Sequence, residues 1–342
     1  MSPSSASANT VEANTITKTE VVVTKTEVIT TSGVSSTNKV EEKSDTKTVI
    51  KTDAGKTSAP AAKPAEAPSA SSDKKKHVLI VYVGLPKKTF DAALRDATVA
   101  SLEKQGCKVT VSDLMAQRFN PVLSINDIGD FDRDEFDYVE DLGAALQKGI
   151  IAEDIRKEQE KVKAADLIIF HYQTLLHDIP AILLGWLQRV LMPSFAFDVR
   201  DNRIFDDGLL KGKKAMVSIS YLGPGSAWTE RGILGDINVS LWPVQNGILR
   251  FCGFEVLKPQ LTYDVRTMKQ GDRAATLSAW GSRLDGIWKE DPMQFIKGAD
   301  FDYKQGWLLK DEAISRLLYS PGAPSTGQHL GRPLPLTSKT KL

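Results

Sequence analysis

The stretch Lys213–Asp236, KKAMVSISYLGPGSAWTERGILGD, decides how the fold of this chain is interpreted. Its first part, Ala215–Ile219, is a short apolar run of the kind that forms a buried strand. The run ends in the loop Leu222–Ser226, whose Gly and Pro residues exclude a helix. In open α/β sheets ligands bind beyond the carboxyl ends of such strands. The loop is therefore either a ligand-binding loop or a plain turn between a strand and a helix.

Four more strand-like runs accompany this one, and helical segments separate them. The strands are expected at Val78–Val83, Lys108–Leu114, Ala165–Tyr172 and Glu255–Leu261. Helices are expected at 90–105, 151–164 and 181–190, within 241–254, and at 274–288. Because strand and helix alternate five times, the sequence predicts an α/β fold. The predicted architecture is a flavodoxin-like, doubly wound, five-stranded parallel sheet with a C-terminal extension.

Composition divides the chain into three parts. Residues 1–76 contain no aromatic residue and too little apolar surface to offset the entropy of ordering, which predicts a disordered N-terminal tail and linker. Residues 77–290 carry the alternating strands and helices of the expected folded domain. Residues 291–342 contain Pro, Gly and isolated aromatic residues, so we expect a C-terminal arm that wraps a partner surface rather than forming its own core.

Charge and composition exclude several classes of function. A net charge of +1 over 342 residues gives no support for nucleic-acid binding. No apolar run reaches membrane-spanning length, and the N-terminus lacks the features of a secretory signal, so we expect a cytoplasmic protein that does not enter a membrane. Two cysteines, both in apolar segments, suit a reducing compartment. Four histidines and two cysteines show no metal-ligand spacing, so no metal site is expected.

Several longer motifs connect the folded part to a known family. They are Ala164–Phe170, Pro180–Trp186, Gly232–Val239, Leu241–Leu249 and Phe251–Tyr263, with Gly327–Pro335 near the end of the chain. Through these motifs the sequence from residue 77 onwards resembles the FAD-dependent NAD(P)H:quinone oxidoreductases. The resemblance implies a flavodoxin-like flavin-binding domain over residues 77–290 and a homodimer whose two sites are shared between subunits. It also implies that NAD(P)H donates a hydride to FAD and that a quinone then takes the hydride from the flavin.

The resemblance assigns each site residue by its position in the motifs. Loops after the first, third and fourth strands are expected to hold FAD, and a further group of residues is expected to line the quinone pocket. The cofactor-binding positions are Lys88, Thr89, Phe90, Thr174, Leu175, Leu176, His177, Ser220, Tyr221, Leu222, Gly223 and Arg273, and the substrate-pocket positions are Phe197, Val199 and Phe251.

The two catalytic positions differ from the family pattern. Trp228 stands where the family has a tyrosine, and Leu234 stands where it has a histidine. Tryptophan can donate one N–H but cannot titrate, and leucine can do neither. Gly84 likewise replaces a histidine that reaches the FAD phosphates in the family. Two hypotheses follow: a flavin-dependent quinone reductase with an altered pocket, or a non-catalytic relative that keeps the dimer scaffold as a binding or regulatory module.

Overall fold

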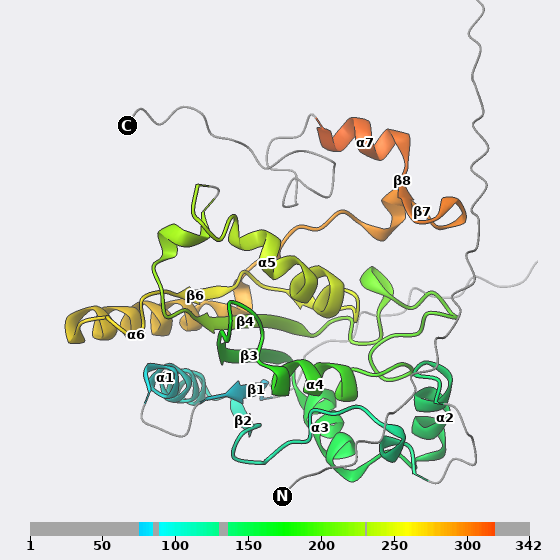
Figure 1. Ribbon diagram of the computed structural model, residues 1–342, viewed down its shortest axis with the longest axis horizontal. Helices are drawn as coiled ribbons and strands as arrows, with labels where there is room; N and C mark the ends of the chain where they lie inside the picture. The colour runs from blue at the N-terminus through cyan, green and yellow to red at the C-terminus, as the bar shows by residue number, and fades with distance from the viewer. Residues whose placement is uncertain (1–74, 85–88, 130–135, 230, 319–342) are drawn as a thin grey trace, which may run out of the picture. The chain divides into compact units, whose positions relative to one another are not determined.

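The computed structural model describes residues 75–84, 89–129, 136–229 and 231–318 (Figure 1). Residues 1–74 of the expected disordered tail, Lys88 of the expected cofactor site and the end of the C-terminal arm lie outside this part. Within the described residues, no helix combines the length and the apolar character needed to cross a membrane.

A parallel sheet forms the centre of the fold. Its strands are β1 (His77–Val83), β2 (Lys108–Asp113), β3 (Leu167–Gln173), β4 (Lys214–Ser220) and β5 (Glu255–Val256), and their spatial order is β2-β1-β3-β4-β5. Every neighbouring pair is parallel. This is the strand order of the flavodoxin-like fold, and it confirms the predicted fold class.

The fifth position of the sheet differs from the prediction. Instead of one strand over Glu255–Leu261, β5 stops at Val256 and a second short strand, β6 (Gln260–Thr262), continues the pairing with β4. Pro259 lies just before β6. Proline has no N–H to donate to a ladder, so a continuous strand through this residue would lose a hydrogen bond. The proline therefore accounts for the break.

Both faces of the sheet are covered, which explains why its central strands are continuous apolar runs. Along β1, Val78, Ile80 and Tyr82 face one layer, and the intervening residues face the other. The first layer consists of α1 (Phe90–Lys104) and α6 (Gln270–Asp285), joined by a hydrogen bond from the Trp280 indole to the Thr98 hydroxyl at 2.7 Å. The second contains α3 (Glu153–Ala164), α4 (Ala181–Val190) and α5 (Ile237–Val244).

The helices differ from the sequence prediction in three places. A helix absent from the prediction, α2 (Glu140–Lys148), buries Leu142 and Ala145, and this short apolar face directly follows the acidic residues Glu140 and Asp141. The last long helix, expected at 274–288, begins at Gln270 and ends at Asp285. Its first turn is polar and mostly exposed, so no apolar residue marks its start in the sequence. The helix expected within 241–254 is α5 followed by a π-helical segment, Gln245–Arg250.

The C-terminal arm has structure of its own, contrary to the expectation. A two-stranded antiparallel pair, β7 (Phe301–Asp302) and β8 (Leu308–Leu309), precedes α7 (Asp311–Leu318). Ile296 and Ala313 are buried in a small cluster of their own, against which Phe301 and Leu309 pack.

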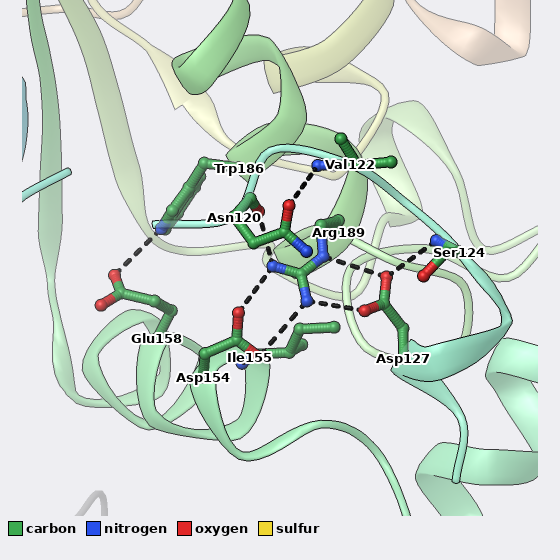
Figure 2. A network of polar contacts seen from close by, with 9 residues as sticks. All are labelled: Asn120, Val122, Ser124, Asp127, Asp154, Ile155, Glu158, Trp186 and Arg189. Atoms are coloured by element: carbon green, nitrogen blue, oxygen red, sulfur yellow. Dashed lines mark hydrogen bonds and ion pairs between the residues drawn. The ribbon is translucent and has the colours of Figure 1, made fainter. Parts of the chain in front are cut away.

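A buried ion-pair network ties α4 to α3 and to the loop before it (Figure 2). Arg189 and Asp127 are each 2% exposed, and the guanidinium donates to both carboxylate oxygens at 2.9 and 2.6 Å. Further hydrogen bonds run from Arg189 to Asp154 at 2.7 Å and to the carbonyl of Asn120 at 2.7 Å. Burial by itself would lower the pKa of Arg189, but the hydrogen bonds to both carboxylates outweigh it and raise the pKa. The arginine therefore stays charged inside the protein.

Candidate functional site

The carboxyl ends of β1, β3 and β4 bring three loops to one edge of the sheet. Strand register places Val83 beside Tyr172, and Gln173 beside Ser220. The first of these loops leads into α1, where the Thr89 side chain accepts a hydrogen bond from the Ala92 amide at 3.3 Å and caps the helix. Phe90 follows and is buried. The expected positions Thr89, Phe90, Thr174 and Ser220 thus lie on elements that meet at this edge.

The loop after β3 is a tight, strained turn. Leu175 and Asp178 exchange backbone hydrogen bonds at 3.0 and 3.1 Å, and the two residues between them have positive φ, 49° for Leu176 and 67° for His177. This combination is typical of a type I′ turn, which favours Asn and Gly. Leucine and histidine in this conformation each cost about 1–2 kcal/mol. The turn holds Leu176 98% exposed, beside a half-exposed Leu175.

Backbone hydrogen bonds to the segment Thr262–Val265 hold the start of the loop after β4. The Tyr221 amide donates to the Thr262 carbonyl at 2.8 Å, and its own carbonyl accepts from the Val265 amide at 3.1 Å. The Gly223 carbonyl accepts from the Asp264 amide at 3.0 Å. Above this base Leu222 is 48% exposed, and a Cβ added to Gly223 would meet no atom within 4 Å. The backbone at Gly223 is therefore open to a close-approaching group.

Aromatic side chains pack behind these two loops. The Tyr221 ring stacks on Tyr263 with centroids 5.1 Å apart and lies 5.1 Å from the ring of Trp228. Trp228 is 6% exposed and contacts the imidazole of His177 edge-on at 5.6 Å. Burial, followed by the neighbouring Tyr263, raises the pKa of Tyr221, so its hydroxyl stays protonated. Trp228 thus contacts residues of both the β3 and the β4 loops.

The second catalytic position has no chemistry of its own. Leu234 is partly buried and packs on the main hydrophobic core, and its amide donates to the Ala227 carbonyl at 2.9 Å. Neither Leu234 nor Trp228 can take up or release a proton. The histidine that the structure does bring to Trp228 is His177, from a different loop. Sequence analysis placed His177 in a cofactor loop but could not foresee this contact.

A buried polar cluster at the carboxyl end of β1 was missed by sequence analysis. His171 is 1% exposed, and its two ring nitrogens lie 2.9 Å from the Ser218 hydroxyl and 3.1 Å from the Asp91 carbonyl. Burial lowers the pKa of His171. The ring stacks on Tyr82, whose hydroxyl would lie 1.8 Å from a Cβ at Gly84. A side chain at position 84 would therefore require the Tyr82 ring to move away from its stack on His171.

The three substrate-pocket positions lie at the opposite edge of the sheet. Phe197 and Val199 belong to the segment that precedes β4, and Phe251 precedes β5. The rings of Phe197 and Phe251 contact each other at 4.9 Å, and Val199 is 46% exposed. Figure 1 shows the segment before β4 on one side of the sheet and the loop from β4 to α5 on the other. One chain therefore does not bring the expected pocket and the expected cofactor loops together.

Arg273 lies at the start of α6, close to Phe90. Its guanidinium donates to the carbonyls of Met268 and Val265, both at 3.2 Å, and lies over the Phe90 ring at 5.5 Å. These contacts fix the loop after β6 against the first turn of α1. Arg273 thus reaches the region of the cofactor loops, with part of its hydrogen-bonding capacity used by the protein.

The carboxyl edge has features that suit a flat, polar-rimmed group such as a flavin. The hydroxyl oxygens of Ser220 and Thr262 are buried and have no partner among the described residues. Exposed leucines at 175, 176 and 222 offer apolar faces, and Gly223 leaves the backbone open. A ring system with hydrogen-bonding edges matches both sets of features, because it would cover apolar surface and pair orphaned hydroxyls. The residues present therefore fit such a group.

The fold and this edge define an α/β protein of the flavodoxin-like class. The family described as having a flavodoxin-like fold matches residues 76–284. The rat NAD(P)H dehydrogenase (quinone) 1 is 38% identical over 270 residues, which are 78% of this chain and 98% of the rat protein. The mouse ribosyldihydronicotinamide dehydrogenase (quinone) is 42% identical over 220 residues, 64% of this chain and 94% of the mouse protein. The chain belongs to the flavodoxin-like quinone oxidoreductase family.

A solved structure supports the same relationship. A protein described as a candidate quinone reductase from Klebsiella pneumoniae superposes with a TM-score of 0.64 and 29% sequence identity. The match covers 72% of this chain and 96% of the Klebsiella protein. The order of strands and the sequence relatives thus indicate the same family.

Proposed function

We propose that the chain is a flavin-dependent NAD(P)H:quinone reductase that transfers a hydride from NAD(P)H through FAD to a quinone. The observation that carries the proposal is the 38% identity to the rat quinone dehydrogenase over 98% of that protein's length. Similarity of this extent covers 78% of this chain rather than one motif. The open, apolar carboxyl edge supports it independently.

The chain's own residues would bind and orient the cofactor. A flavin supplies the two-electron chemistry when bound, and the protein supplies binding and orientation. The open backbone at Gly223 and the orphaned hydroxyls of Ser220 and Thr262 are suited to hydrogen bonding. Leu176 and Leu222 would exclude water from one face of the ring system. Thr89, which caps α1, stands at the positive end of a helix dipole, a favourable place for a phosphate.

The site has few groups that could stabilise negative charge on a reduced flavin. The Trp228 indole can donate one hydrogen bond, and the buried Tyr221 remains a neutral donor because its pKa is raised. Neither group replaces a titrating histidine, so we expect slower turnover than in relatives that keep the tyrosine and histidine. Removal of one donor to a developing charge typically lowers kcat about 10²- to 10³-fold.

We further propose that the active form is a homodimer. The residues expected to line the quinone pocket lie at the amino edge of the sheet, whereas the cofactor loops lie at the carboxyl edge. A second copy could bring its Phe197, Val199 and Phe251 to the first copy's loops. Light scattering at micromolar concentration should then give twice the 37.5 kDa chain mass. A species of the chain mass alone would contradict the shared site.

The decisive experiment is a measurement of bound flavin followed by turnover. Protein purified without added cofactor, and again after incubation with FAD or FMN, is scanned for the flavin band near about 450 nm. Released cofactor identifies FAD or FMN, and oxidation of NADH and NADPH is then followed with a simple benzoquinone. We expect FAD retention and slow quinone-dependent oxidation. A well-folded dimer that retains neither flavin would instead support the non-catalytic binding module.

A cytoplasmic location forms part of the same proposal. Cys107 and Cys252 are both free and buried. Burial raises the pKa of the Cys252 thiol to about 12, so it remains protonated and unreactive. Two free, buried cysteines suit a reducing compartment.

A further inference from the structure

Strand β2 lies at one edge of the sheet, and the side of its backbone that faces away from β1 is open. The Lys108 amide donates to the Lys76 carbonyl at 2.8 Å, so Lys108 and every second residue after it bond to β1. Val109 and Val111, which alternate with them, direct their backbone groups to the other side. Among the described residues, no hydrogen bond satisfies these outward groups.

An open edge of this kind is a template for one more strand. Unpaired amides and carbonyls at a sheet edge bind an extended segment through backbone hydrogen bonds, and native proteins usually block or cover such an edge. The strand itself, KVTVSD, contains no proline, and its charged residues, Lys108 and Asp113, stand at its two ends. The middle of β2 therefore has nothing that discourages pairing.

A hollow of about 760 Å³ adjoins the carboxyl end of β2, between α3 and the segment that follows the strand. The Gln117 amide on one wall donates to the Asp113 carbonyl at 2.9 Å, and Lys161 on the other donates to the Ser112 hydroxyl at 2.9 Å. Side chains of both charges line the hollow, among them Arg118, Lys157, Glu160 and Lys161. A strand added along the free edge would therefore meet mixed charge on its α3 side.

The two faces of β2 make different demands on such a strand. Val109 and Val111 pack against the layer that contains α1 and α6. On the other face the Ser112 hydroxyl donates to the Glu158 carboxylate of α3 at 2.8 Å. Side chains alternate between the two faces along a strand. A matching strand therefore needs apolar residues at every second position and polar or charged residues between them.

A repeated sequence near the start of the chain has this alternation. It is Lys18–Thr24, KTEVVVT, and a near-copy, KTEVITT, follows it directly. In an extended segment Val21 and Val23 fall on one face, and Lys18 and Glu20 fall on the other. Its β-branched residues favour extended backbone. By itself the segment cannot bury enough apolar surface to fold, but an existing edge supplies both hydrogen-bond partners and apolar contacts.

We propose that Lys18–Thr24 pairs with the free edge of β2 in the same chain and extends the sheet by one strand. β1 begins at His77, beside Lys108, so the connecting residues 25–76 end next to the strand that the segment must reach. A random-coil linker of this length would span about 40 Å, about twice the length of β2. Tethering gives the segment an effective concentration on the order of millimolar, so weak pairing suffices. The pairing does not involve the cofactor loops or depend on flavin.

Hydrogen exchange of single amides, followed by NMR, tests the pairing in the full chain. Prolines remove backbone donors from the repeat and its near-copy in the test variant, and the control variant carries as many prolines before the repeat. The amides of Val109 and Val111 should exchange at least about tenfold faster in the test variant than in the wild type or the control. The amides of Thr110 and Ser112, which bond to β1, should stay protected in all three proteins and so report that the domain is folded. The test variant is Val21→Pro, Val23→Pro and Val28→Pro, and the control variant is Ser4→Pro, Ser7→Pro and Asn9→Pro.

Tryptic cleavage of the native full chain provides a second readout. In the wild type the bond after Lys18 should be cut at least about tenfold more slowly than the bond after Lys39, whereas the test variant should lose this difference. The proposal is overturned if Val109 and Val111 exchange equally fast in the wild type and the test variant, if the control variant loses the same protection, or if the wild type is cut equally fast after both lysines. It is equally overturned if protection falls when the protein is diluted about tenfold, because the added strand would then come from another copy.

Discussion

Replacing Arg189 with methionine should destabilise the protein by about 3–5 kcal/mol, because it leaves a buried carboxylate without its partner. Asp127 is 2% exposed, and both of its oxygens accept hydrogen bonds from Arg189. Methionine would fill much of the arginine's volume, so the loss comes from the uncompensated charge rather than from a cavity. Asp154 contributes less, because its side chain is 42% exposed and can be solvated.

Urea unfolding followed by tryptophan fluorescence measures this loss. With a urea dependence of about 3 kcal/mol per M, the unfolding midpoint should fall by about 1–1.7 M. Arg156→Met is the matched control, since its ion pair with Glu153 is exposed on both sides and water screens it, so its removal should change stability little. The double variant Arg189→Met with Asp127→Asn should be more stable than Arg189→Met alone, because it also removes the buried charge.

A small change in the unfolding midpoint of Arg189→Met would contradict a stabilising role for the buried ion pair. If Arg189→Met moved the midpoint no more than Arg156→Met does, the network in Figure 2 could not be what holds α3 and α4 to the preceding loop. If the double variant were less stable than Arg189→Met, hydrogen bonding by Asp127 to the Ser124 amide, at 3.2 Å, would matter more than its charge.

Three further predictions follow from the site. Leu176→Gly should raise the free energy of unfolding by about 1 kcal/mol, because glycine relieves the left-handed turn, whereas Leu175→Gly should lower it; urea unfolding measures both. Flavin absorbance should show that Leu176→Gly retains less flavin. Burial lowers the pKa of His171, so at acidic pH the unfolded chain binds a proton that the folded chain does not. The free energy of unfolding should therefore fall as the pH drops below about 6.5. Unfolding measured from pH 7.5 to 5 should show a smaller fall in His171→Gln. The triple variant Leu176→Trp, Trp228→Tyr and Leu234→His should raise FAD occupancy and quinone turnover; equal FAD affinity by fluorescence titration would show that these positions do not limit binding.

Much of the fold could be predicted because burial leaves a periodic signal in the sequence. Continuous apolar runs predicted β1, β3 and β4 within a residue or two, and their alternation with helices predicted the sheet. The short α2 was not predicted, because its buried apolar face consists of little more than Leu142 and Ala145 and directly follows the acidic Glu140 and Asp141. The small cluster of the arm could not be predicted either, because it joins Ile296 to Ala313, which lie seventeen positions apart in the sequence.

The candidate site could be predicted by position but not by contact. Motifs placed the residues from Thr174 to His177 and from Ser220 to Gly223 in loops, and the structure brings both loops to one edge. No local pattern indicates that His177 meets Trp228 or that Tyr82 closes over Gly84, because each contact joins residues that only the folded backbone brings into register. The buried His171 had a weak signal, a histidine within an otherwise apolar strand.

Backbone strain marks two regions of the described residues, the loop after β3 and the segments that contain Phe205 and Trp307. Eight described non-glycine residues have positive φ, and four of them are Leu176, His177, Phe205 and Trp307. Each such residue costs about 1–3 kcal/mol, which the rest of the fold must offset. Strain of this size is tolerated where it holds a side chain in a position that relaxed backbone would not give it. In both regions the result is an exposed or half-exposed apolar side chain beside a packed aromatic group. Strain at Leu176 and His177 thus holds in place the apolar surface at the carboxyl edge that the proposed flavin would cover.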